Sequence, residues 1–438
     1  MLKRFLALDG WTKVVLFLLC GALYLGKGAS YVSLAFGGIL LFSPRLLWDR
    51  WYVALTRRRD PLNEFAWALL VSLLYGFAQL IYGILLGYKV VTAFEILVFN
   101  ICPVYLFLGI WVGYLHQGTV RAYIRYTAWS LVIYTPLYFL LLGGMNLTVG
   151  GDADTPLLFS PPTGSVPLLG LLAYETDLAT FWLPILVLSC LTIANQERAD
   201  WIGLGLALMV WGKLSKKINR VFAVLGTITV VLAIAALIDL RLPAIAGRGG
   251  ELSARETVAR LAGAISPQLA EDVGGTAANS SFYYGTVYWR EHWWANIRQE
   301  VTKDPGTLIF GLGYGYPLAV LTGNAGTVQQ GTRSPHSIFY FTLAYSGVIG
   351  VLIFFWLEIA VVRLLYRTFK VTGQIFGLGY FVYTLFNAFF GNVLETPFAI
   401  AFYLILGLCI GPMFRQLDSD SRDARAALAE PVHAAELV

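Results

Sequence analysis

The chain has 438 residues, of which 58% are hydrophobic and only 13% are charged, and its mean hydropathy is +0.68. Soluble domains carry about 25% charged residues, so this composition excludes a chain that is soluble throughout. The formal net charge of +5 does not indicate a nucleic-acid partner, because the cations cluster at the borders of apolar segments. We therefore predict an all-α polytopic membrane protein in contact with membrane lipids.

Apolar runs of about 20 residues recur along the whole chain, and each is long enough to cross roughly 30 Å of hydrocarbon. The first run has no small-residue cleavage site after it, so we expect a retained helix and not a removed signal peptide. We predict about 12 spans in total. In chain order they lie near residues 14–26, 30–44, 64–86, 90–115, 127–146, 157–174, 178–195, 200–214, 219–239, 337–360, 373–390 and 397–415.

Clusters of Lys and Arg predict which loops face the cytoplasm. They stand at Arg57–Arg59, Lys213–Arg220 and Arg363–Lys370, and they predict that both termini are cytoplasmic. Counting spans forward puts Gly150 outside, whereas counting backward puts Glu175 inside. Something between these residues must therefore cross, and we predict a short, broken span at 157–174 despite its prolines and glycines.

One large polar loop lies between the ninth and tenth predicted spans, on the outer, periplasmic side. Helical patterns occupy about 252–266 and 280–303 of this loop. The predicted organisation is 1–240 for the N-terminal transmembrane helices, 241–335 for the periplasmic loop, 336–415 for the C-terminal transmembrane helices and 416–438 for a disordered cytoplasmic tail.

His336 is one of four histidines and stands at the outer mouth of a predicted helix, directly after Pro335. An exposed neutral imidazole titrates near pH 6.5 and can take a proton from a hydroxyl. The alternative is a histidine that merely sits at the membrane interface. Position alone leaves both interpretations open.

Two arginines are predicted at the same outer surface. Arg198 lies in "NQERADWIGL", where one span ends and the next begins, and Arg290 lies in the aromatic-rich "YYGTVYWREHWWANIRQE". Guanidinium binds phosphate oxygens through two parallel hydrogen bonds and does not deprotonate, so the pair suggests a pyrophosphate site. Alternatively, each is an interfacial arginine that snorkels beside Trp and Tyr.

Three further motifs have open interpretations. "GLGYGYP" at Gly311–Pro317 is not the dinucleotide fingerprint, since it reads G-x-G-x-G without a preceding strand pattern. It is either a turn that brings backbone amides near a ligand or a plain loop. The triplet Asp152–Asp154 has the D-x-D form that some sugar transferases use for a metal, and it also arises by chance. Glu395 ends another helix on the outer side and is a candidate to orient the histidine or an acceptor hydroxyl.

In the order and spacing of these motifs the chain resembles the O-antigen ligase superfamily, which includes O-antigen and exopolysaccharide polymerases. The resemblance rests on "ERADWIGL", "WREHWWANI" and "GLGYGY" followed by "SPHSIFYFTLAYSGVIG". It covers residues 280–400 best. The family typically shows His-Asn where this chain has His336-Ser337.

The resemblance implies a GT-C-like inner-membrane glycosyltransferase that moves a glycan from undecaprenyl pyrophosphate to a hydroxyl acceptor at the periplasmic face. It implies no cofactor, neither metal nor nucleotide sugar. Arg198 and Arg290 match the family's pyrophosphate-binding arginines and His336 its proposed base, with Arg333, Glu395 and Tyr314 as supporting candidates. An acceptor on lipid A–core would make the protein a lipopolysaccharide ligase, and a carrier-linked glycan would make it a polymerase. A glycolipid flippase or transporter is the alternative of another class.

Overall fold

The protein is almost entirely helical over the part of the chain that its computed structural model describes. The described residues are 10–24, 44–142, 159–194, 197–238, 242–243, 251–253, 257–259, 280–322, 334–391, 394 and 398–429. Within them the strands are one antiparallel pair, β1 (Leu242–Pro243) and β2 (Glu251–Leu252). Helices long and apolar enough to cross a membrane lie at Asn63–Leu85, Val90–Leu115, Ile218–Ala235, Ile338–Thr372 and Phe398–Asp420. The predicted class, a helical membrane protein, is thereby confirmed.

The helices follow one another with short connections. The N-terminal half contains α2 (Gly10–Tyr24), α4 (Pro44–Thr56), α5 (Asn63–Leu85), α6 (Val90–Ile101), η1 (Cys102–Val104), α7 (Tyr105–Leu115), α8 (Thr119–Leu137), the π-helical turn η2 (Tyr138–Leu142), α9 (Ser165–Tyr174), η4 (Leu178–Phe181), α10 (Trp182–Ala194), α11 (Arg198–Ser215) and α12 (Ile218–Leu237). The C-terminal half contains α15 (Ser280–Val301), α16 (Pro305–Phe310), η5 (Leu318–Thr322), α18 (Ile338–Thr372), α19 (Phe376–Phe390) and α20 (Phe398–Ala429).

Among the described residues, helices lie at the predicted spans, and five of these helices are long and apolar enough to cross a membrane. The predicted span at 30–44 lies outside the described residues. The basic segment after it carries α4, whose Trp51 donates its indole N–H to the Ala66 carbonyl, so tertiary packing makes this segment helical. We predicted a disordered tail from residue 416, but α20 continues to Ala429, because alanine is the best helix former.

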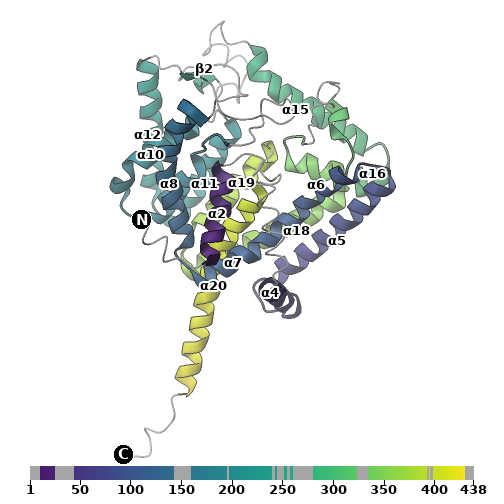
Figure 1. Cartoon of the computed structure of the whole chain (residues 1–438), viewed down its shortest axis with the longest axis horizontal. Helices are drawn as coiled ribbons and strands as arrows, with labels where there is room; N and C mark the ends of the chain where they lie inside the picture. Colours follow the sequence, from purple (N-terminus) through teal and green to yellow (C-terminus); the bar gives the residue numbers. More distant parts are fainter. Residues whose placement is uncertain are drawn as a thin grey trace, which may run out of the picture.

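The two ends of the bundle carry different parts of the chain (Figure 1). The β pair and α15, both from the polar insert 241–335, lie at the top of the view. At the bottom lie helix α4, from the basic segment that follows the second predicted span, and the projecting C-terminal part of α20. The described part of the polar insert and helix α4 of the basic segment therefore lie at opposite ends of the bundle.

The predicted broken span at 157–174 forms a helix only over its second half. Ser160 accepts a hydrogen bond from the Tyr134 hydroxyl (2.7 Å), whereas Glu175 contacts Arg125. Tyr134 and Arg125 are nine residues apart on α8, or about 13 Å of helix. The segment thus runs antiparallel to α8 as an extended piece followed by the ten-residue helix α9.

Paired glycines bring α7 and α20 into backbone contact. Gly109 and Gly113 on α7 face Gly407 and Gly411 on α20, and a Cβ atom at Gly109 would lie 2.2 Å from the Leu404 carbonyl oxygen. In hydrocarbon, helices associate chiefly through such close van der Waals contact between small residues. The Gly-x-x-x-Gly spacing on both helices is therefore the reason why they pack together.

The "GLGYGY" motif forms a glycine-dependent turn that packs inside the bundle. Gly311, Gly313 and Gly315 have φ angles of 83°, 84° and 95°, a region that only glycine enters readily. The Leu312 N–H donates to the Ala344 carbonyl of α18 at 2.7 Å. The motif is therefore an ordered turn with a structural role, called here the GLGYGY turn.

The GLGYGY turn fills a break in α18. The helix has non-helical angles at Gly347 (φ 62°, ψ −165°), which leaves backbone groups of the preceding turn without helical partners. The Tyr75 hydroxyl donates to the Ser346 carbonyl, and Gln79 donates to the Phe310 carbonyl, both at 2.7 Å. Irregular backbone within a membrane-embedded bundle is stable only when protein groups satisfy it in this way.

We predict that Gly311→Ala destabilises the protein by about 2 kcal/mol or more. A Cβ atom there would sit 2.5 Å from the Ser346 amide nitrogen at a φ angle unsuited to alanine. Gly205→Ala is the matched control, because a Cβ on Gly205 meets nothing within 4 Å and alanine favours helix. Thermal unfolding in detergent, followed by tryptophan fluorescence, measures both. Equal midpoints for the two variants would contradict this account.

Candidate functional site

His336 occupies a tight turn immediately before α18. Its φ angle is 52°, a left-handed conformation that is uncommon for a residue with a side chain. Its amide N–H donates to the Ser334 hydroxyl at 3.1 Å. Backbone conformations of this kind cost roughly 1–3 kcal/mol and concentrate at functional sites, so the geometry marks His336 beyond what its position in the sequence could.

The aromatic residues of α15 hold this turn in place. Trp293 is fully buried and donates its indole N–H to the Leu318 carbonyl at 3.0 Å, which anchors α15. Trp294 donates to the Pro335 carbonyl at 2.7 Å. The Trp289 ring meets the His336 ring edge-on, with the centroids 6.1 Å apart. The aromatic run therefore fixes the histidine turn against α15.

Arg290 connects α15 to the last residue of α19. Its Nη1 donates to the Phe390 carbonyl oxygen at 2.9 Å, and its positive charge acts on the neighbouring His336 imidazole. A guanidinium has five N–H groups, so one arginine can donate to several acceptors. The structure thus brings Arg290 and His336, two of the predicted site residues, into one neighbourhood.

Arg198 lies at the start of α11, beside the same end of α19. Two residues further on, Asp200 is buried and accepts hydrogen bonds from the Tyr383 hydroxyl of α19 and from Ser165 Oγ (2.7 Å). Tyr383 is seven residues before Phe390, or about 10 Å along the helix. Helix α11 runs antiparallel to α19, because Gly203 faces Asn387 and Gly379 faces the Ala207 carbonyl, so Arg198 lies toward the same end of α19 as Phe390.

The environment of His336 makes its imidazole a weak base. Burial and then the positive charge of Arg290 lower the pKa of His336 from 6.5 to about 4. We expected an exposed imidazole titrating near pH 6.5, but the side chain is half-buried. At neutral pH the ring is uncharged, and one ring nitrogen can accept a proton.

The other candidate residues are placed as follows. Arg333, Glu395, Asp152 and Asp154 lie outside the described residues. Tyr314 is buried in the GLGYGY turn, where its hydroxyl donates to Asn100 Oδ1 at 2.6 Å, so its contacts are those of a core residue. Within the described ranges, no three His, Cys, Asp or Glu side chains are grouped closely enough to hold a metal ion.

Sequence reasoning missed two buried carboxyl groups that lie within helices. Asp200 joins three helices near Arg198, although its place in "ERAD" resembled an exposed helix start. Glu358 of α18 is 2% exposed and accepts a hydrogen bond from the Tyr403 hydroxyl of α20. An acidic residue within an apolar span was the signal that could have identified Glu358.

The fold therefore defines a membrane-embedded helical protein with a histidine–arginine cluster at one end. A comparison with protein-family models and with curated proteins finds no match.

Proposed function

We propose that the protein is an inverting glycan transferase that uses an undecaprenyl-pyrophosphate-linked glycan as its donor. The observation that carries the proposal is the juxtaposition of an uncharged, conformationally strained His336 with the Arg290 guanidinium at one end of an apolar bundle. This combination suits a reaction between a pyrophosphate leaving group and a neutral hydroxyl acceptor. It also agrees with the family resemblance of the same motifs.

In the proposed reaction the acceptor hydroxyl oxygen attacks the anomeric carbon of the donor sugar. The bond from that carbon to the pyrophosphate oxygen breaks, and undecaprenyl pyrophosphate leaves with the electron pair. His336 takes the proton of the acceptor hydroxyl. Arg198 and Arg290 bind the pyrophosphate and offset the negative charge that grows on it as the bond breaks. Attack opposite the leaving group inverts the anomeric centre.

The proposed orientation places this end of the bundle at the periplasmic face of the inner membrane, with 12 spans and both termini in the cytoplasm. It rests on the basic segments at the opposite end of the bundle. The reaction needs no ATP there, because cleavage of the carrier's sugar–pyrophosphate bond supplies the free energy. A lipid A–core acceptor is our first choice, and a second carrier-linked glycan, as in a polymerase, is the alternative.

A transporter of glycolipids is the second candidate function, and buried Glu358 is the observation that favours it. Transporters place ionisable groups within their spans and bind substrate near the bilayer midplane. Reconstitution in liposomes separates the two classes. Rapid flipping of the lipid-linked glycan without its transfer would replace the transferase proposal.

The test of the proposal is glycan transfer by the purified protein from lipid-linked donor to lipid A–core. We expect transfer that persists in EDTA, since two arginines supply the positive charge that a metal would otherwise provide. Gel mobility of the acceptor measures the product, and the second carrier-linked glycan serves as the parallel acceptor. Loss of activity in EDTA with recovery in Mg²⁺ or Mn²⁺ would contradict the metal-free mechanism and direct attention to Asp152 and Asp154.

We also predict that the acid limb of kcat/KM lies near pH 4 and that activity does not fall around pH 6.5. The pKa of His336 is lowered to about 4, so the free enzyme keeps its proton acceptor uncharged down to that pH. Bound pyrophosphate opposes the charge of Arg290 and raises the histidine pKa, so the acid limb of kcat should lie at higher pH than that of kcat/KM. A limb of kcat/KM at pH 6.5 would contradict the half-buried environment.

A further inference from the structure

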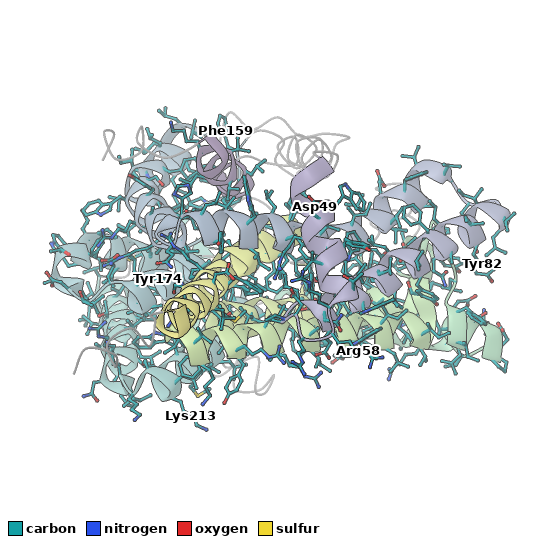
Figure 2. All side chains as sticks on the ribbon, turned by 90° about the horizontal axis from the view of Figure 1, so that it is seen from below. Asp49, Arg58, Tyr82, Phe159, Tyr174 and Lys213 are labelled. Carbon is teal, nitrogen blue, oxygen red and sulfur yellow. The ribbon has the colours of Figure 1, made fainter. Side chains whose placement is uncertain are left out.

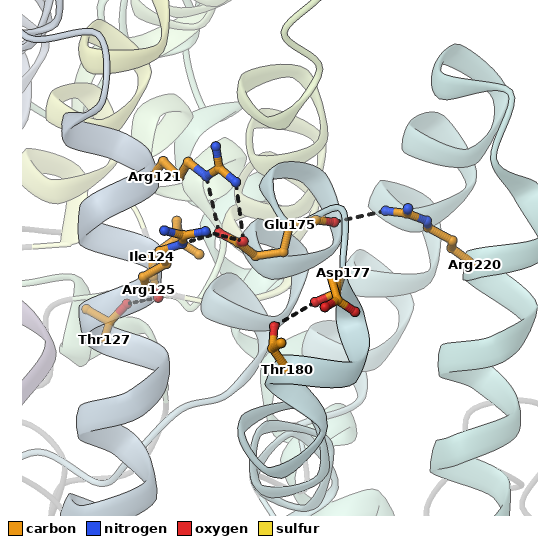
Figure 3. Close-up of polar contacts among 8 residues, drawn as sticks. All are labelled: Arg121, Ile124, Arg125, Thr127, Glu175, Asp177, Thr180 and Arg220. Atoms are coloured by element: carbon orange, nitrogen blue, oxygen red, sulfur yellow. Dashed lines mark hydrogen bonds and ion pairs between the residues drawn. The ribbon is translucent and has the colours of Figure 1, made fainter.

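At the end of the bundle opposite His336, three arginines converge on one short turn after α9. Arg121 and Arg125, one turn apart on α8, both bind the Glu175 carboxylate through two hydrogen bonds (3.3 and 3.4 Å; 2.5 and 2.6 Å). Arg220 from the first turn of α12 donates to the carbonyl oxygens of Glu175 (3.0 Å) and Thr176 (3.1 Å). Figure 3 shows Arg121 and Arg125 reaching Glu175 from one helix and Arg220 approaching from another.

This arginine cluster has more positive charge than its carboxylates balance. Glu175 is 3% exposed, and the nearest other acid on the turn is Asp177, which is bound to the Ala179 amide. Burial alone would raise the pKa of Glu175, but hydrogen bonds and charge from Arg125 and Arg121 hold it below its usual value. The adjoining α11–α12 turn adds the exposed cations Lys213, Lys216 and Lys217. Together these residues carry six positive charges and two negative charges.

The arginines are held in place while their donors stay accessible. Arg121 and Arg125 each use two of five N–H groups on Glu175, and their side chains are 45% and 37% exposed. The buried carboxylate already orients both guanidinium groups. The two arginine side chains therefore lose little further conformational entropy when a phosphate binds them. Phosphate oxygens are the acceptors that this fork geometry matches best.

Bare apolar helix surface begins directly beside the cluster. Only 11% of the apolar segment Ile218–Ala235 of α12 is buried, and its exposed residues include Phe222 and Leu225, within two turns of Arg220. Exposed Trp182 starts the neighbouring α10. A soluble phosphate would leave this surface uncovered, whereas the acyl chains of a lipid would cover it.

The cluster lies at the end of the bundle that faces the predicted cytoplasmic leaflet. Arg415 of α20 donates to the Leu115 carbonyl, four residues before α8 begins, so the start of α8 shares a level with the projecting part of α20. Figure 2 looks onto this end, where Arg58 and Lys213 are labelled. Anionic lipids of that leaflet are attracted to basic pockets between helices.

We propose that Arg121, Arg125 and Arg220 form a binding site for the phosphate headgroup of an anionic glycerophospholipid. The headgroup contacts the guanidinium donors left over from Glu175, and its acyl chains lie along α10 and α12. The exposed lysines of the α11–α12 turn strengthen the attraction. This site is separate from the glycan-transfer site and does not depend on that function.

Native mass spectrometry of the delipidated full-length protein tests the site, with phosphatidylglycerol and phosphatidylcholine offered at equal concentration. We expect phosphatidylglycerol to bind more tightly, and Arg121→Gln to weaken that binding about tenfold, the effect of one charge-assisted hydrogen bond. Arg125 still holds Glu175 in this variant, so the fold is kept. Lys217→Gln, at an exposed position, repeats the test if Arg121→Gln fails to fold. Arg298→Gln, at an exposed position of α15 at the other end of the bundle, is the control and should change nothing.

Three results would overturn the proposal. They are equal binding of the two lipids by the wild-type protein, unchanged phosphatidylglycerol binding in the Arg121 and Lys217 variants, and displacement of phosphatidylglycerol by an equal concentration of glycerol 3-phosphate. The last would identify a soluble-phosphate site. None of these measurements involves glycan transfer, so they leave the proposed function to its own test.

Discussion

His336→Ala is expected to lower turnover of glycan transfer by about 10²–10⁴-fold, the usual contribution of a positioned proton acceptor. The donor should still bind, because in the proposed site the imidazole meets the acceptor hydroxyl and the arginines meet the pyrophosphate. Alanine keeps the Ser334 contact to the backbone N–H. Single-turnover kinetics and direct binding of lipid-linked donor measure the two effects separately.

His292 provides the matched control for this variant. It lies on the same helix as Trp289 and Arg290 but is exposed, and His292→Ala should retain near wild-type transfer. His336→Gly adds a second comparison. Glycine accepts the φ angle of 52° without strain, so it should be at least as stable as the alanine variant and equally inactive. Near-normal transfer by a well-expressed His336→Ala protein would leave the histidine as an interfacial residue with no part in catalysis.

The sequence predicted the helices well because hydrophobic length is a local property. A run of apolar residues must be helical to satisfy its backbone within the membrane, whatever its neighbours are. The break in α18 was not predicted, because it depends on a partner more than 30 residues away. Gly347 permits the break, but Leu312, Tyr75 and the other residues that satisfy its backbone come from elsewhere in the chain.

The same distinction applies to the candidate site. Residue type and position indicated Arg290 and His336, and the structure brings these two together. The basicity of the histidine depends on burial and on a cation from another segment, so pattern alone suggested a pKa near 6.5 in place of about 4. Glu175 is a further example, since Arg121, Arg125 and Arg220 approach it from two helices that are about 100 residues apart.

Arg290→Lys is expected to reduce kcat/KM by about 10²-fold although the positive charge is kept, a loss comparable to that of one transition-state donor. Arg290 donates through Nη1 to the Phe390 carbonyl, and its guanidinium is a planar fork of the geometry that suits phosphate oxygens. Lysine is a point charge without this fork. A lysine ammonium that stays bonded to the Phe390 carbonyl does not present two parallel donors to the pyrophosphate, so donor affinity and turnover should fall together.

Arg298→Lys is the control, because Arg298 is exposed two turns further along α15 and should tolerate the change. Donor binding, turnover and the thermal midpoint should be measured for both variants. If Arg290→Lys lowers the thermal midpoint enough to account for the lost activity, Arg290 has only a structural role in joining α15 to α19. A stable Arg290→Lys protein with weak donor binding would instead support direct contact with the pyrophosphate, since the tie to Phe390 needs only one of the donors that lysine retains.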